Sequence, residues 1–164
     1  MDVKGMREIL FRGKRLDNGE WVEGYLYEHE PALVGIASEN DVPEPSKWFI
    51  ARTGFADWNM PRPVEFVEID PSTVGQYTGL KDKNGKRIFE GDIVAQNWYD
   101  YDEPRDDSFG NVEFCEYDCS FSVMDVNKDG FMPLGRCDSY HWEVEVIGNV
   151  HDNPELLEDF NKEA

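Results

Sequence analysis

The sequence predicts a mainly β protein, and two features support this fold class. Short alternating runs of apolar residues recur along the 164-residue chain, whereas the 3.6-residue spacing of amphipathic helices is almost absent. Asn, Asp, Gly and Pro, the residues that favour tight turns, separate these runs. A chain of this length corresponds to one ordinary domain or to two small lobes that share a core.

Residues 1–73 are expected to begin with a β-hairpin. Strand-like runs at 9–11 and 21–27 flank Asp17-Asn18-Gly19. Asn and Gly readily adopt the positive φ that a tight hairpin requires. The N-terminal hairpin therefore packs on the rest of the protein or builds a small β lobe of its own.

The hairpin is followed by a proline-rich stretch, which we expect to be an irregular lobe. Five of the nine prolines lie between residues 28 and 63. Because proline has no N–H to donate to a sheet, they predict irregular connections around one strand at 48–52. A strand at 64–69 and a turn at 70–73 are expected to end this region.

Residues 74–164 are expected to form a small SH3-like barrel with a short C-terminal helix. The segment 82–86 predicts a hairpin with Asn84-Gly85 in a type I′ turn. Glu90-Gly91-Asp92 predicts a sharp turn that leads into the apolar run 93–95. Several short strands within about 75 residues favour a small closed or nearly closed barrel, since closure removes exposed edges.

The later part of the barrel is expected to contain three further elements. Residues 111–126 have the character of one long strand or two successive strands, and 142–150 form the last strand. Asn153 and Pro154 predict the start of a helix at 155–160, because Pro at the first helical position loses only an unpaired N–H.

Four segments occur in a characteristic order along the chain: residues 6–12 (MREILFR), 73–85 (TVGQYTGLKDKNG), 88–94 (IFEGDIV) and 146–157 (VIGNVHDNPELL). Together they resemble the YopX family of phage and prophage proteins. The resemblance implies an SH3-type barrel in the C-terminal half, a phage or prophage origin and a cytoplasmic protein of undetermined function. It implies no catalytic residues.

The chain is strongly acidic, with 35 acidic and 16 basic residues and a formal charge of −19. Direct binding to a phosphate backbone is disfavoured at this charge. The N-terminus has no continuous apolar run typical of a secretory signal, and no apolar stretch approaches the roughly 18 residues of a membrane span. Three cysteines and no export signal predict reduced thiols in the cytoplasm.

Acidic residues gather in a segment expected to be a loop between two strands. A solvated loop that keeps the protein soluble is one interpretation. The other is a surface that imitates nucleic acid or binds a basic partner. The residues concerned are Asp100, Asp102, Glu103, Asp106 and Asp107.

Two patterns are typical of metal sites. Cys115, Cys119, Cys137 and His141 would satisfy tetrahedral zinc, but two thiols four residues apart on one strand are separated by roughly 13 Å, so a turn at Asp118 is needed. The alternative is ordinary, partly buried thiols.

The second metal-like pattern, Asp125 to Gly130, copies half of a calcium loop. Position twelve of this loop would be Arg136, where calcium loops place a bidentate Glu, and an Asx-type turn explains the same residues. Neither this pattern nor the cysteine set leads us to assign a cofactor.

The sequence favours a binding protein over an enzyme. It has no nucleophile elbow, no phosphate-binding loop and no dinucleotide-binding turn. The pair Cys137 and His141 lies beyond hydrogen-bond reach if both are on one strand. The five tryptophans are interpreted as core or interface anchors rather than base-stacking platforms, and Trp58 is expected to be an exposed contact.

Three functional hypotheses follow. The preferred one is a non-catalytic accessory protein that self-associates, as a homo-oligomer, or binds a host or phage protein through Trp58 or the acidic segment. The second is a thiol or zinc-assisted enzyme centred on the cysteines and His141. The third is an acidic mimic of nucleic acid at residues 100–107.

Overall fold

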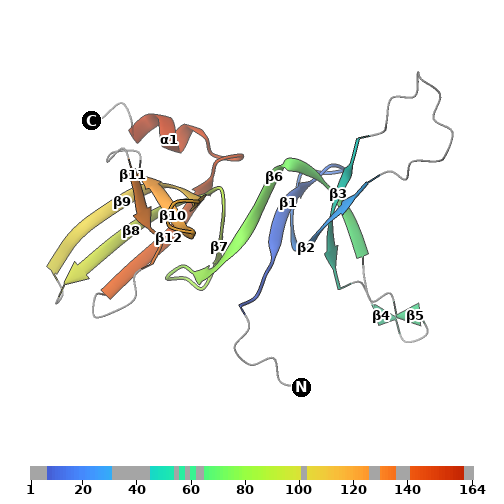
Figure 1. Cartoon of the computed structure of the whole chain (residues 1–164), viewed down its shortest axis with the longest axis horizontal. Helices are drawn as coiled ribbons and strands as arrows, with labels where there is room; N and C mark the ends of the chain where they lie inside the picture. The colour runs from blue at the N-terminus through green and yellow to red at the C-terminus, as the bar shows by residue number, and fades with distance from the viewer. Residues whose placement is uncertain are drawn as a thin grey trace. The chain divides into compact units, whose positions relative to one another are not determined.

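The computed structural model describes residues 7–30, 45–53, 56–57, 60–61, 65–100, 103–125, 130–135 and 141–160. These residues are strands and turns apart from one short helix, which confirms the mainly β prediction (Figure 1). The chain divides into two compact units. We call Ile9–Val74 the N-terminal unit, and Met1–Glu8 with Gly75–Ala164 the C-terminal unit.

Four strands form the main sheet of the N-terminal unit: β1 (Phe11–Arg15), β2 (Trp21–His29), β3 (Lys47–Arg52) and the first part of β6 (Glu65–Lys81). β1 and β2 form the predicted antiparallel hairpin, whose turn places Gly19 at φ 72°. β2 pairs with β3, β3 with β6, and β6 also with β1. Each strand therefore has a hydrogen-bonded neighbour on both sides, which stabilises strands too short to persist alone.

The core of the N-terminal unit is a small apolar cluster of Val22, Ile50, Val67 and Ile69, none more than 7% exposed. Gly24 lets β2 approach β3 closely, because a Cβ at this position would lie 2.4 Å from the carbonyl oxygen of Ala51. A larger residue at Gly24 would push these strands apart.

β6 runs without interruption through residues 70–73, so the turn predicted there is wrong. The Asp70 carboxylate accepts a hydrogen bond of 2.9 Å from the Ser72 N–H, and the Lys14 N–H donates to Thr73 Oγ1 at 2.8 Å. Pro71 is compatible with this geometry because its fixed φ also occurs in extended chain. Hydrogen bonds with side chains and with the neighbouring strand β1 thus hold this segment in the sheet, although its composition is typical of a turn.

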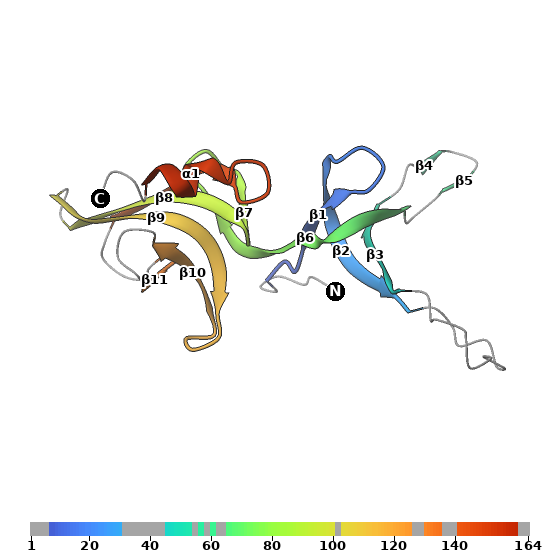
Figure 2. The same ribbon diagram turned by 90° about the horizontal axis from the view of Figure 1, so that it is seen from above.

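The C-terminal unit contains an antiparallel sheet of five strands: β8 (Asp92–Asp100), β9 (Glu103–Cys115), β10 (Ser120–Asp125), β11 (Gly130–Pro133) and β12 (His141–Asn149). Their order in the sheet is β11-β10-β9-β8-β12. Figure 2 shows β9 and β10 as a curved hairpin. A further short strand, β7 (Arg87–Phe89), pairs with β6.

This sheet is open in the described part of the chain and does not confirm the predicted SH3-like barrel. β11 and β12 are its outer strands, and no pairing within the described part of the chain joins them. The SH3-like expectation depended on the number of strands and their tight turns, but closure also requires a matching register between the first and last strands. The inner face of this open sheet carries the buried side chains of Val94, Val112, Val123 and Val144, which belong to one apolar cluster.

The turn from β6 to β7 lies where it was predicted, but its type differs. A type I′ turn needs positive φ at both central residues, and of Asn84 and Gly85 only Gly85, at 81°, has it. Asp82 organises the turn, since its Oδ1 accepts hydrogen bonds from the backbone N–H groups of Asn84 and Lys86 at 2.8 and 2.9 Å. Its Oδ2 accepts from the Val146 N–H at 3.3 Å, which ties the turn to β12.

The Gly91-Asp92 turn is also confirmed, and the carboxylate of Asp92 is fully buried. Gly91 has φ 77°, and Asp92 accepts a hydrogen bond from the Phe89 N–H at 2.8 Å and one from Asn149 Nδ2 at 3.5 Å. Asp92 is therefore scaffold, because it joins β7, β8 and the end of β12.

The predicted helix is present as α1 (Glu155–Phe160). The side chain of Leu156 in this helix packs on Gly148 of β12, where an added Cβ would lie 2.7 Å from Leu156 Cδ1.

In the proline-rich stretch, β3 confirms the predicted strand. Two further strands of two residues each, β4 (Ala56–Asp57) and β5 (Met60–Pro61), pair with one another. No helix within the described residues has the length and apolar character needed to cross a membrane.

Candidate functional site

The cysteines proposed as zinc ligands differ in their surroundings. Cys115 ends β9 and is buried, whereas Cys119 is exposed in the turn to β10, where its thiol donates to the Glu116 carbonyl oxygen at 3.5 Å. The required turn near Asp118 is thus present, spanning residues 116–119. Among the described residues no three His, Cys, Asp or Glu side chains gather as metal ligands would. Cys137 and the side chain of His141 lie outside the described residues, so the zinc site stays a prediction.

The proposed calcium loop is described only at its ends. Asp125 ends β10 with 2% of its surface exposed, and Gly130 begins β11. Residues 126–129 and Arg136 lie outside the described part of the chain, and the calcium hypothesis is likewise untested.

The acidic segment is a β-hairpin, so the expected loop is wrong. β8 ends at Asp100, β9 begins at Glu103, and Asp106 and Asp107 pair with Trp98 and Asn97. Pairing with a neighbouring strand determines this structure, since strand formation depends more on context than on the propensity of a polar segment. The side chains of all five acidic residues, and Asp102 entirely, lie outside the described residues, and their role in binding stays a prediction.

The described tryptophans Trp21, Trp48 and Trp142 are half-buried. Trp48 and Trp142 pack against the apolar cores of their units, and Trp21 lies 4.7 Å from the guanidinium of Arg12. These contacts agree with the interpretation of tryptophans as anchors. Trp58 and the side chain of Trp98 lie outside the described residues.

An exposed group of aromatic rings covers the outer side of β2, β3 and β6 in the N-terminal unit. We call Tyr25, Tyr27, Phe49 and Phe66 the aromatic face. Tyr25 is 64%, Tyr27 46% and Phe66 56% exposed. The strand register explains the grouping, because Tyr27 pairs with Phe49, and Tyr25 and Phe66 both pair with the small Ala51.

Three rings of the aromatic face, those of Tyr27, Phe49 and Phe66, contact one another. The centroids of Tyr27 and Phe66 lie 5.6 Å apart with the rings edge to face, and those of Phe49 and Phe66 lie 6.5 Å apart at 90°. Tyr27 and Phe49 are 6.3 Å apart. Edge-to-face pairs at these separations are favourable, so the face is held in shape without a partner.

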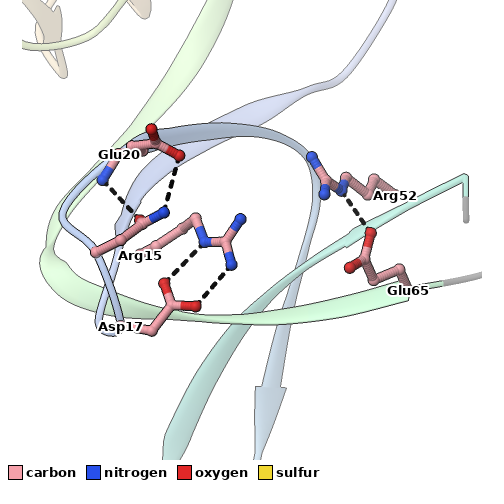
Figure 3. Close-up of polar contacts among 6 residues, drawn as sticks. Arg15, Asp17, Glu20, Arg52 and Glu65 are labelled. Atoms are coloured by element: carbon pink, nitrogen blue, oxygen red, sulfur yellow. Dashed lines mark hydrogen bonds and ion pairs between the residues drawn. The ribbon is translucent and has the colours of Figure 1, made fainter.

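A hollow of about 400 Å³ adjoins the aromatic face at Phe66 and is also lined by Leu16 and Val67. Two ion pairs of this unit are drawn in Figure 3. Arg15 binds the Asp17 carboxylate through two nitrogens, at 2.6 and 2.9 Å, and lines the hollow with it.

The second ion pair joins neighbouring strands. Arg52 Nε donates to Glu65 Oε2 at 2.9 Å, linking β3 to β6. Because Glu65 also lines the hollow, charged and apolar side chains lie side by side there, as they do at the rim of protein interfaces.

The hydrogen bond between Arg15 and Asp17 lowers the pKa of the Asp17 carboxyl and raises the pKa of Arg15. Both groups are exposed to solvent, where ion pairs add little to stability. Their contribution is to orient charges beside Leu16.

The sequence shows the alternation that produces the aromatic face, but it does not show that this side of the strands is exposed. Tyr25 and Tyr27 alternate with Leu26, and Phe49 and Phe66 alternate with Ile50 and Val67. Both faces of these strands are apolar, so alternation does not indicate which side is buried. The observed register decides which side is buried, because it brings the aliphatic side chains of these strands together in the core.

A family model described as YopX protein matches residues 10–158. A solved structure, the crystal structure of protein EF1440 from Enterococcus faecalis, is 26% identical, with 93% of this chain and 99% of that chain covered and a TM-score of 0.45. No curated protein matches the chain in sequence.

Proposed function

The chain belongs to the YopX family, and from this premise we propose that it is a non-catalytic accessory protein that binds another protein through its aromatic face. We further propose a phage or prophage origin and action in the bacterial cytoplasm, which the family resemblance implies. The observation that carries the proposal is the group of three strongly exposed aromatic rings on β2 and β6, on either side of Phe49 of β3.

Exposed aromatic clusters favour contact with proteins. Tyr and Phe are enriched in protein interfaces, and each buries a large apolar area at little cost in side-chain entropy. The rings of the aromatic face provide no nucleophile and no general base. Their chemistry supports binding by burial of apolar surface.

The charges near the aromatic face support a protein partner over a nucleic acid. Aromatic platforms that bind single strands also need a positive groove. Here Arg52 is paired with Glu65, Glu68 lies opposite Phe49 in the register, and the whole chain carries −19. A partner surface that presents Lys or Arg beside apolar residues fits best, because cations are attracted to aromatic rings and to carboxylates.

A second copy of the chain is the other partner within this proposal. Its net charge opposes self-association most strongly at low ionic strength, where screening is weak. A homo-oligomer formed through the aromatic face would therefore strengthen as salt is added, whereas a complex with a basic partner would weaken.

The test combines sedimentation of the purified chain with capture from cells that carry the phage or prophage. The double variant Tyr27→Ser with Phe66→Ser is expected to weaken self-association or partner binding at least about tenfold. The matched control is Tyr117→Ser, which removes an exposed aromatic ring in the C-terminal unit and is expected to have no effect.

Two results would contradict the proposal. One is a monomer at every salt concentration together with no partner that is lost in the double variant and rebinds when purified. The other is equal loss of binding in the Tyr117 control, which would place the contact elsewhere.

A further inference from the structure

The C-terminal unit contains a hollow of about 400 Å³, separate from the aromatic face. We call it the Arg7 pocket. Its volume is within the range of small-molecule sites, which are concave and lined mainly by apolar side chains with few polar groups. The lining includes Arg7, Leu80, Phe114, Phe121, Leu134 and Trp142.

The aromatic walls of the Arg7 pocket are positioned by neighbouring contacts. Phe114 and Phe121 lie edge to face with centroids 5.3 Å apart. The indole Nε1 of Trp142 donates to Gln96 Oε1 at 2.9 Å. Gln96 is fully buried, and its amide nitrogen donates to the Pro133 carbonyl oxygen at 3.2 Å. The ring of Trp142 is therefore held in place by the interior of the unit, with its polar atom already satisfied.

Arg7 alone carries a full charge among the described lining residues. Its side chain lies over Gly79, where an added Cβ would be 3.5 Å from Arg7 Cδ, and Gly79 has φ 90°, which favours glycine. Arg7 makes no hydrogen bond or ion pair with the described part of the chain. Its neighbour Glu8 instead binds Arg87 at 3.3 Å.

An uncompensated guanidinium beside aromatic walls has a definite chemical preference. Arg binds carboxylates through paired N–H groups, and such charge-assisted hydrogen bonds are stronger than neutral ones. Ser120 also lines the pocket, and a serine hydroxyl is able to donate to an oxygen. The apolar walls favour a hydrophobic body attached to the acidic group.

We propose that the Arg7 pocket binds a small carboxylate that carries an aromatic or branched apolar body. The body packs against Phe121 and Trp142, and the carboxylate pairs with Arg7. This site goes beyond the proposed protein contact, because it lies in the other unit and takes a different class of ligand.

The experiment titrates the full chain with three probes of similar shape: 3-phenylpropionate, its neutral amide and the cation 3-phenylpropylamine. Binding is followed by NMR through the indole N–H of Trp142, assigned with Trp142→Phe. We expect the carboxylate to bind about fivefold to tenfold more tightly than the amide, because only the acid forms an ion pair with Arg7. The amine is expected to bind most weakly.

The Arg7→Gln variant removes the charge and is expected to reduce carboxylate affinity to that of the amide. Its matched control is Lys86→Gln, an equal loss of charge at an exposed turn residue that does not line the pocket. Because Arg7 is exposed, its variant is expected to remain folded, and circular dichroism checks this.

Cys119 gives an independent measurement, since its exposed thiol lines the same pocket while Cys115 is buried. Bound carboxylate is expected to slow alkylation of Cys119, measured by peptide mass spectrometry, in the parent chain and in Lys86→Gln but not in Arg7→Gln. Equal binding of acid and amide, equal affinity in Arg7→Gln and the parent, or no binding at millimolar probe would each overturn the proposal.

Discussion

The interiors of the two units differ in chemistry. In the N-terminal unit the fully buried large side chains are Ile50 and Ile69, whereas in the C-terminal unit Gln96 and Asp92 are buried beside apolar residues. An apolar interior depends on volume and shape, but a buried polar group depends on each of its hydrogen-bond partners. We therefore expect the N-terminal unit to be most sensitive to cavities and the C-terminal unit to the loss of single polar contacts.

The largest effect is expected for Ile50→Ala. Ile50 has no exposed surface and belongs to a cluster of four buried residues. Removing three carbons from this site is expected to lower the free energy of unfolding by about 3 kcal/mol, from lost burial and from the cavity. Urea unfolding measures the loss, and hydrogen exchange in peptides from β1, β2 and β3 assigns it to the N-terminal unit.

The control for Ile50→Ala is Phe66→Ala in the same unit. Phe66 is exposed on the aromatic face, so its removal is expected to cost less than about 1 kcal/mol. Equal destabilisation by the two variants would contradict the division into an aliphatic core and an exposed aromatic face.

A smaller loss, about 2 kcal/mol, is expected for Gln96→Leu, which keeps the volume but removes the buried amide. The indole of Trp142, the Gly135 N–H and the Pro133 carbonyl would each lose a partner. Hydrogen exchange should increase in β8, β11 and β12, with the N-terminal unit unchanged. Asn97→Leu on the exposed side of β8 serves as the control. A larger loss of stability in Asn97→Leu than in Gln96→Leu would show that the buried amide is not the cause of the effect.

The smallest effect, about 1 kcal/mol, is expected for Asp82→Asn. Burial alone would raise the pKa of the Asp82 carboxyl, but hydrogen bonds from the backbone N–H groups of Lys86, Val146 and Asn84 outweigh it and lower the pKa below the ordinary value of 3.8. The stabilisation is therefore complete above the unfolded-state pKa and is lost as the pH falls through the lower, folded-state pKa.

The measurement for Asp82 is the free energy of unfolding from pH 6 down to pH 2. The parent chain should lose more stability than Asp82→Asn below pH 3.8, so that the two curves converge in acid. Asp118→Asn, an exposed turn residue, should leave the curve of the parent unchanged. Parallel curves for the parent and Asp82→Asn would show that the carboxylate does not stabilise the turn.

Local structure was predictable wherever a few neighbouring residues determine it. Asp17 to Gly19, the turn at 82–86, Gly91 and the helix at 155–160 were all expected where the structure has them. In each case short-range chemistry decides the outcome, because positive φ at Gly or the fixed φ of Pro depends little on distant parts of the chain.

The errors occur where pairing with a distant strand decides the structure. Residues 70–73 have the composition of a turn, yet they continue β6, where Thr73 bonds to Lys14 of β1. Residues 103–107 belong to β9 through pairing with β8. The open edge between β11 and β12 in the described sheet likewise depends on register, which turn residues do not encode.

The sequence by itself determined the mainly β class, the positions of the hairpins, the C-terminal helix and membership of the family. Tertiary structure alone decided which face of β2, β3 and β6 is exposed and which side chains gather around Arg7. The physical reason is that a strand with apolar residues on both sides has no intrinsic inside. Its buried face is selected only when Ile50 and Val67 meet Val22 from another strand, which leaves Tyr27 and Phe66 in solvent.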